Sequence, residues 1–197
     1  MNKAARSVAA LAAFLPATAL LALHFRDGPP ARVTGGFGED SCLACHSGNA
    51  LNQAGGRLTL SGIPERYLPG ATYELELTLS RPPKLAAAGF QLAIRRAADK
   101  MQAGTIRLST EDEPRMGLLD ERGVQFAHHR LAEAAPPGAD SVRWKLSWTA
   151  PANAGQVILH AAAVAGDGDD SQLGDYVYKL EAATEPSLVM APSPDRP

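Results

Sequence analysis

Hydrophobic and polar residues alternate along much of the chain beyond residue 57, as they do in strands that bury one face. The alternation is clearest in residues 72–79 and 143–148, where leucine, tyrosine or tryptophan recurs at every second position. Weaker strand signals follow at short intervals, in residues 89–95, 104–109, 124–130, 156–163 and 176–181. Turns rich in proline and glycine separate these segments. The pattern predicts an all-β protein in which two antiparallel sheets pack face to face.

The composition agrees with short strands joined by turns. The chain of 197 residues holds 18 Gly and 15 Pro but only 6% aromatic residues, which argues against a bundle of long helices. With 19 Lys and Arg against 21 Asp and Glu, the net charge is −2, and no nucleic-acid partner is expected. Beyond the N-terminus no apolar stretch is long enough to cross a bilayer, which excludes a polytopic membrane protein.

The first residues have the pattern of an export signal. Lys3 and Arg6 precede an apolar run over residues 7–23, and Ala17 and Ala19 offer a cleavage pattern of small residues. The apolar run continues past this pattern, so residues 1–26 are either a cleaved signal peptide or an N-terminal membrane anchor. In both cases the remainder is expected to be exported, to the periplasm or the cell surface.

The only two cysteines, Cys42 and Cys45, are followed at once by His46, which gives the C-x-x-C-H pattern of covalent c-type haem attachment. Two thiols one helical turn apart can each add to a vinyl group at one edge of a porphyrin. The next residue can then place its imidazole on the iron as the proximal ligand. Residues 27–56 are therefore predicted to be a haem-attachment segment that binds one covalent haem c.

Other interpretations of the two cysteines remain open. A local Cys42–Cys45 disulfide is chemically allowed but leaves His46 unexplained. A structural zinc ion needs four ligands, and no second cysteine pair exists. The glycine-rich residues 34–41 would let the backbone approach a flat ring, and Asp40 or Ser41 could cap a short helix at the cysteines. For residues 27–36, a flexible linker is the alternative.

Several short motifs occur in the order seen in Reeler-type (reelin N-terminal-like) domains: residues 67–73, 89–92, 103–105, 148–151 and 174–178. The form with a preceding C-x-x-C-H segment resembles the bacterial "choice-of-anchor V" proteins. This resemblance implies an immunoglobulin-like sandwich over residues 57–184, an exported location and, in redox contexts, a haem partner. Residues 185–197 contain no apolar anchor, so the family's surface attachment is not carried over, and this tail is predicted to be disordered.

The resemblance also suggests a second iron ligand. His129 matches a histidine near the end of a strand in the Reeler-like pattern, with His128, Met101 and Met116 as fallbacks. Adjacent residues of a strand face opposite ways, so only one of His128 and His129 can reach a given haem. The alternative is that both are polar residues on a half-exposed strand. His160 lies in an apolar run and is interpreted as a hydrogen-bonded core histidine.

Two polar clusters have weaker interpretations. Asp167, Asp169 and Asp170 resemble a calcium loop in composition, but the spacing of an EF-hand fails, and a solvated hairpin turn is expected. Arg95 and Arg96, with Lys100 close by, form a basic group that could pair with haem propionates or an acidic partner. The alternative for this group is a solvated strand end.

The main functional prediction is a monohaem c-type cytochrome that carries electrons outside the cytoplasm to or from a redox protein. The alternative is a cell-surface interaction or adhesion module in which haem is structural or absent. A third possibility is a five-coordinate haem that binds small gases or peroxide. No nucleophile and base are arranged as in a hydrolase, so the chain is not expected to be an enzyme.

Overall fold

The computed structural model describes residues 28–82, 85–110, 114–130, 133–134, 139–153 and 155–187. The predicted signal or anchor, residues 1–26, lies outside this part of the chain. Over the described ranges no helix combines the length and apolar character needed to cross a bilayer.

The described residues form strands almost throughout, with one short 3-10 helix, η1 (Cys42–Ala44). The strands in chain order are β1 (Ser47–Gly48), β2 (Arg57–Ser61), β3 (Arg66–Tyr67), β4 (Thr72–Ser80), β5 (Ala87–Arg96), β6 (Thr105–Leu108), β7 (Met116–Glu121), β8 (Val124–His129), β9 (Glu133–Ala134), β10 (Ser141–Thr149), β11 (Val157–Gly166) and β12 (Leu173–Pro186).

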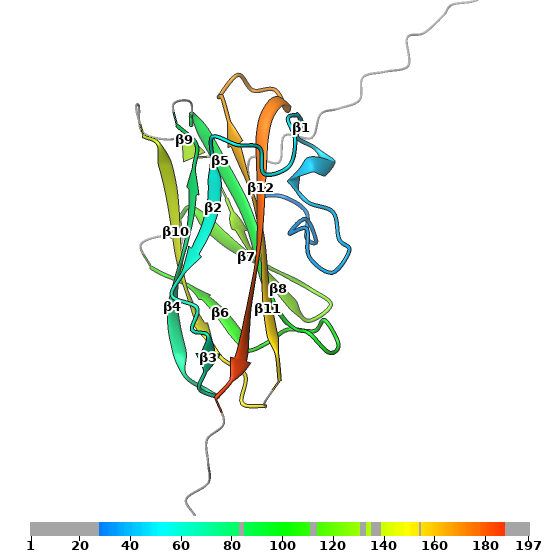
Figure 1. The fold of residues 1–197 in the computed structure, drawn as a ribbon, viewed down its shortest axis with the longest axis vertical. Helices are drawn as coiled ribbons and strands as arrows, with labels where there is room; N and C mark the ends of the chain where they lie inside the picture. The colour runs from blue at the N-terminus through cyan, green and yellow to red at the C-terminus, as the bar shows by residue number, and fades with distance from the viewer. Residues whose placement is uncertain are drawn as a thin grey trace, which may run out of the picture.

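Two sheets pack into a sandwich (Figure 1). The four-stranded sheet has the order β2-β4-β10-β6, and the eight-stranded sheet has the order β1-β12-β11-β5-β8-β7, with β3 beside β12 and β9 beside β5. All pairings are antiparallel except those of β1 and β3 with β12. The predicted all-β sandwich is confirmed.

The core lies between the inner faces of the sheets and explains the alternating pattern. In β4 and β10 the alternate hydrophobic residues are buried, and their register places Trp144 opposite Leu77. The ring of Phe90, on the eight-stranded sheet, lies 4.6 Å from that of Trp144, centroid to centroid. Burial of large side chains such as these supplies most of the driving force for folding, about 1.5–3 kcal/mol for each.

The structure corrects two details of the predicted elements. Met116, which lies outside the strands predicted from the sequence, begins β7 and is fully buried. The pattern of β7 does not alternate, because its first two residues are both buried. The predicted tail starts too early, because β12 continues to Pro186 and pairs there with β3. Residues 188–197 lie outside the described chain.

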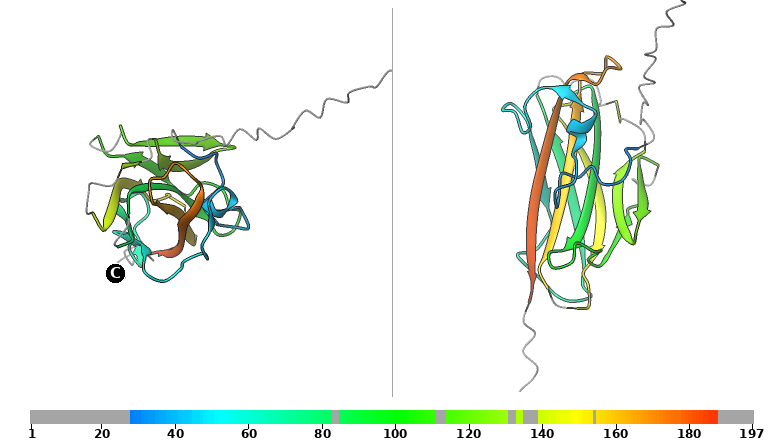
Figure 2. Two further views of the ribbon diagram at one scale, coloured as in Figure 1. Left: turned by 90° about the horizontal axis from the view of Figure 1, so that it is seen from above. Right: turned by 90° about the vertical axis from the view of Figure 1, so that its right-hand side faces the viewer.

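The segment before β1 lies across the outer face of the eight-stranded sheet (Figure 2, right). The buried side chain of Gln91 on β5 holds it there: its Oε1 accepts the Val33 N–H at 2.7 Å, and its Nε2 donates to the Pro30 carbonyl at 2.8 Å. A flexible linker is therefore ruled out for residues 28–36. This docking brings the following cysteine segment onto the sheet.

Candidate functional site

The cysteines lie on and just after a capped helical turn. The Oγ of Ser41 accepts the Leu43 N–H at 3.3 Å and so caps η1, as expected for one of the two candidate residues. The Cys42 carbonyl accepts the N–H groups of Cys45 at 3.2 Å and His46 at 2.9 Å. Both thiols are free in the structure. The backbone of Cys42, Cys45 and His46 thus forms one turn that closes on the Cys42 carbonyl.

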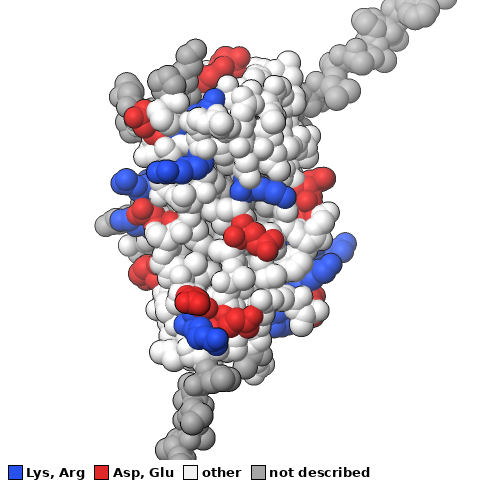
Figure 3. Space-filling view, in the orientation of Figure 1, with Lys and Arg blue, Asp and Glu red and all other residues white. Residues whose placement is uncertain are grey.

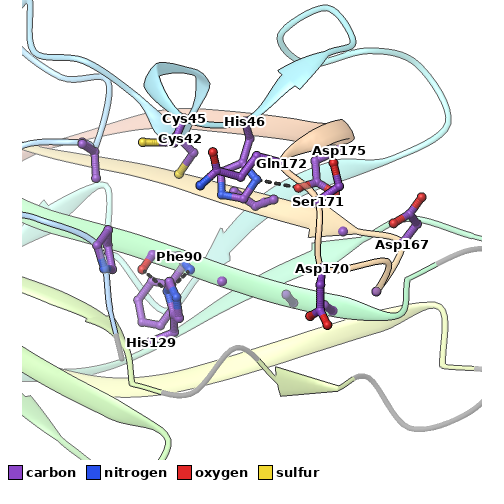
Figure 4. A pocket seen from close by; sticks show the side chains of 18 of the residues that line it. Cys42, Cys45, His46, Phe90, His129, Asp167, Asp170, Ser171, Gln172 and Asp175 are labelled. Atoms are coloured by element: carbon purple, nitrogen blue, oxygen red, sulfur yellow. Dashed lines mark hydrogen bonds and ion pairs between the residues drawn. The ribbon is translucent and has the colours of Figure 1, made fainter. Parts of the chain in front are cut away.

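Cys42, Cys45, His46 and His129 line one pocket of about 470 Å³. Figure 4 shows the two cysteines and His46 on one side of it and His129 with Phe90 on the other. Strand β5, the end of β11 and the hairpin between β11 and β12 supply most of the remaining walls. The volume falls within the range of small-molecule and cofactor sites.

The ring of His46 is held by Asp175 on β12. Its Nδ1 lies 2.5 Å from Oδ2 of the Asp175 carboxylate, whose side chain is 4% exposed (Figure 4). With the carboxylate as the acceptor, Nδ1 is the donor in this contact. In the Nδ1–H tautomer the Nε2 lone pair is available to a metal. This is the arrangement usual for metal-ligating histidines.

The segment after His46 is also fixed to β12. The amide of Asn49 donates to the carbonyl oxygens of Gly174 at 2.7 Å and Asp175 at 3.1 Å, and the Ser47 N–H donates to the Gln172 carbonyl at 2.9 Å. Gly48 has a φ of 108°, and a Cβ there would lie 2.8 Å from the Gly174 nitrogen. Only glycine suits this position. These contacts hold the histidine beside its carboxylate.

On the other side of the pocket, His129 lies against β5. Its Nδ1 is 3.0 Å from the Phe90 nitrogen and 3.2 Å from the Phe90 oxygen, so the tautomer decides whether it accepts or donates. A Cβ on Gly89 would lie 2.7 Å from the His129 Cε1 atom. The absence of a side chain at Gly89 therefore makes room for the imidazole.

The other candidate ligands lie elsewhere. His128 is buried, its Nδ1 lies 2.7 Å from the His129 carbonyl oxygen, and it does not line the pocket. Burial lowers its pKa. Met101 is 41% exposed between β5 and β6, and Met116 lies in the core. The structure thus brings His129 to the cysteine pocket and none of the three fallbacks.

His160 is buried against the glycine-rich segment. Its Nε2 lies 3.0 Å from a Glu181 carboxylate oxygen, and the ring of Phe37 packs edge-on at 4.8 Å. Burial lowers its pKa, although the bond to Glu181 opposes this. His160 is therefore buried and hydrogen-bonded, as expected, but it lies beneath the N-terminal segment and not in the core between the sheets.

In the basic group predicted at Arg95, Arg96 and Lys100, both arginines are paired with carboxylates of the chain itself. Arg95 is 2% exposed and donates two hydrogen bonds to Glu39, at 2.7 and 2.8 Å. Arg96 pairs with Asp99. Burial by itself raises the pKa of Glu39. The hydrogen bonds and charge of Arg95 and the charge of Arg32 lower it by more, so the pKa lies below its usual value of 4.5. The proposed pairing of Arg95 with propionates is therefore wrong.

The aspartate-rich segment is a hairpin turn, as expected. Asp167 accepts the Asp169 N–H at 3.1 Å, and Asp169 accepts the Ser171 N–H at 2.8 Å. Among the described residues no group of three or more His, Cys, Asp or Glu side chains is placed to hold a metal ion.

Burial raises the pKa of the Cys42 thiol to about 12. That thiol is therefore neutral near pH 7.

Sequence reasoning missed the roles of Asp175 and Gly89. Asp175 lies 129 residues from His46, and the contact depends on the parallel pairing of β1 with β12. Gly89 was noted only as part of a family motif. No local signal in the sequence marks either contact, because both arise from packing between distant segments.

Comparison with known proteins supports the fold. No protein-family model matches the chain, and no curated protein matches it. The Reelin-N domain of F-spondin is similar in structure, with a TM-score of 0.51 and 22% identity over 74% of this chain and 95% of that one. The human F-spondin reeler domain gives a TM-score of 0.50 and 20% identity, over 73% and 96% of the two chains. The sandwich thus has a Reeler-like fold.

Proposed function

We propose that the chain is an exported monohaem c-type cytochrome, with Cys42 and Cys45 as the attachment residues, His46 as the proximal ligand and His129 as the distal ligand. One observation carries this proposal: the C-x-x-C-H segment and His129 line the same pocket from different sides. The likeness in sequence pattern to choice-of-anchor V proteins with the same motif also supports it.

The residues present fit a covalently bound haem. Both thiols are free, and Nδ1 of His46 is bonded to Asp175. The wall formed by the start of β5 and the residue before it carries small residues, Ala86, Ala87, Ala88 and Gly89. When bound, haem iron supplies one-electron transfer between its ferric and ferrous states. The protein's part is to hold the ligands, exclude water from the inner wall and set the electrostatic environment.

The attachment turn lies at the surface, where a redox partner could approach. Cys45 is exposed and Leu43 is 36% exposed. Charges of both signs are interspersed on the face shown in Figure 3. A protein partner that docks here would meet the exposed carboxylates of Asp167 and Asp170, which line the same pocket.

The experiment is an absorption spectrum of the exported protein, produced in a host with cytochrome c maturation machinery. A sharp alpha band on reduction, lost in the Cys42→Ser/Cys45→Ser variant, supports the proposal. A wild-type protein that matures in this host without a haem spectrum would overturn it. The Ser47→Ala variant is the matched control, since Ser47 flanks the motif but supplies neither thiol nor imidazole.

A cell-surface interaction module is the second candidate, and the comparisons favour it over the cytochrome. The specific observation is the Reeler-like fold shared with F-spondin domains. In this function the sandwich would bind a partner whether or not haem is attached. Binding to the producing cell's surface that survives unchanged in Cys42→Ser/Cys45→Ser would support the module and leave the haem without a role in adhesion.

A further inference from the structure

The carboxylate of Asp175 is buried and pairs with His46. Its side chain is 4% exposed, and among the described residues it forms an ion pair only with His46. Gly166 makes room for it, because a Cβ there would lie 3.2 Å from Oδ1. A buried carboxylate that lost this partner would carry an uncompensated charge. The folded protein therefore depends on the contact between Asp175 and His46 to compensate the buried carboxylate.

We infer that Asp175 is a positioning residue that fixes the His46 tautomer and lowers the reduction potential of the haem; the second part rests on the proposed function. A carboxylate that accepts Nδ1–H makes the ring a stronger donor through Nε2. Its negative charge, poorly screened when buried, also favours the more positive ferric state. Both effects act in the same direction.

Other acidic residues line the same pocket but are placed differently. Asp167 and Asp170 lie in the exposed hairpin between β11 and β12, and Asp167 accepts a backbone N–H of its own turn. Neither is paired with His46. They test whether any pocket carboxylate sets the potential or only the one bonded to the proximal ring.

The first measurement is the reduction potential of the haem-loaded protein and two variants. Asp175→Asn keeps an oxygen acceptor and removes the charge, and we expect the ferrous-to-ferric ratio at a fixed applied potential to rise about tenfold, or about 59 mV. Asp167→Asn, the matched control, should stay close to wild type. A potential in Asp175→Asn equal to that of the control would overturn the inference. A wild-type protein without haem would instead overturn the proposed function.

The second measurement needs no haem. In the Cys42→Ser/Cys45→Ser protein at alkaline pH, ¹⁵N NMR of the histidine rings should show His46 with its proton on Nδ1. Asp175→Ala in the same background should increase the Nε2–H tautomer, and dispersion of the amide spectrum checks that the variant is folded. If the Cys42→Ser/Cys45→Ser protein that retains Asp175 carries the His46 proton mainly on Nε2, the inference is contradicted. This result holds even if the Asp175→Ala variant does not fold.

Discussion

Glu39 accepts both arms of the Arg95 guanidinium, at 2.7 and 2.8 Å, although Glu39 lies before the cysteine turn and Arg95 lies on β5. Arg32 adds a third hydrogen bond to the same carboxylate at 2.9 Å. Phe37 lies under the Arg95 guanidinium, 4.7 Å from its central carbon. This cluster fastens the N-terminal segment to the outer face of the sheet.

Removal of Glu39 should destabilise the protein strongly. Glu39→Ala leaves the Arg95 charge buried without its carboxylate, and we expect a loss of about 3 kcal/mol in the free energy of unfolding. Urea denaturation measures it. Asp99→Ala, which breaks the exposed pair with Arg96, is the control and should change stability little. Equal losses in the free energy of unfolding for the two substitutions would show that the buried Glu39–Arg95 pair stabilises the protein no more than the exposed pair does.

Stability should fall as the pH is lowered through about 6.5, in part because of His160. Burial holds its pKa below 6.5 in the folded protein, so the unfolded chain binds the proton first and is favoured as pH falls. In His160→Gln the slope of unfolding free energy against pH between pH 7.5 and 5.5 should become shallower. Some dependence of the unfolding free energy on pH should remain in this variant, because burial also lowers the pKa of His128. An unchanged slope in His160→Gln would contradict this.

The two adjacent histidines of β8 should behave differently. In haem-loaded His129→Ala, the reduced protein should bind carbon monoxide rapidly, since the sixth position would be open; wild type and His128→Ala should bind it slowly. Stopped-flow spectroscopy measures the rates. Rapid binding by wild type would instead support a five-coordinate site, and rapid binding by His128→Ala alone would reverse the assignment.

Gly89 should be intolerant of a methyl group. Because a Cβ would lie 2.7 Å from the His129 ring, Gly89→Ala should displace the imidazole and imitate His129→Ala in the carbon monoxide experiment. The buried Ala88→Gly, one residue earlier, is the control and should retain slow binding. If both variants bind carbon monoxide slowly, the position of the His129 imidazole does not require the absence of a side chain at Gly89.

The sequence was most informative where burial follows a simple period. Strands β4 and β10 were predicted because Leu75, Leu77 and Trp144 alternate with polar residues. Strand β7 was missed because Met116 and Gly117 are both buried and break the alternation. Ser41, the capping residue, was one of the two candidates, because capping depends only on neighbours in the chain.

Contacts between distant segments could not be predicted. Arg95 was taken for an exposed cation because nothing near it in sequence shows that Glu39, 56 residues earlier, covers it. Asp175 was likewise part of a strand motif with no assigned role. His129 was suggested by resemblance alone, and its position in the cysteine pocket depends on how β8 lies beside β5.

The most direct test of the account is the intact mass of the exported protein made with the haem maturation machinery present. The account predicts the mass of the mature polypeptide plus one haem, with Cys42 and Cys45 both resistant to alkylation after denaturation. The polypeptide mass alone, with both cysteines alkylated, would contradict it.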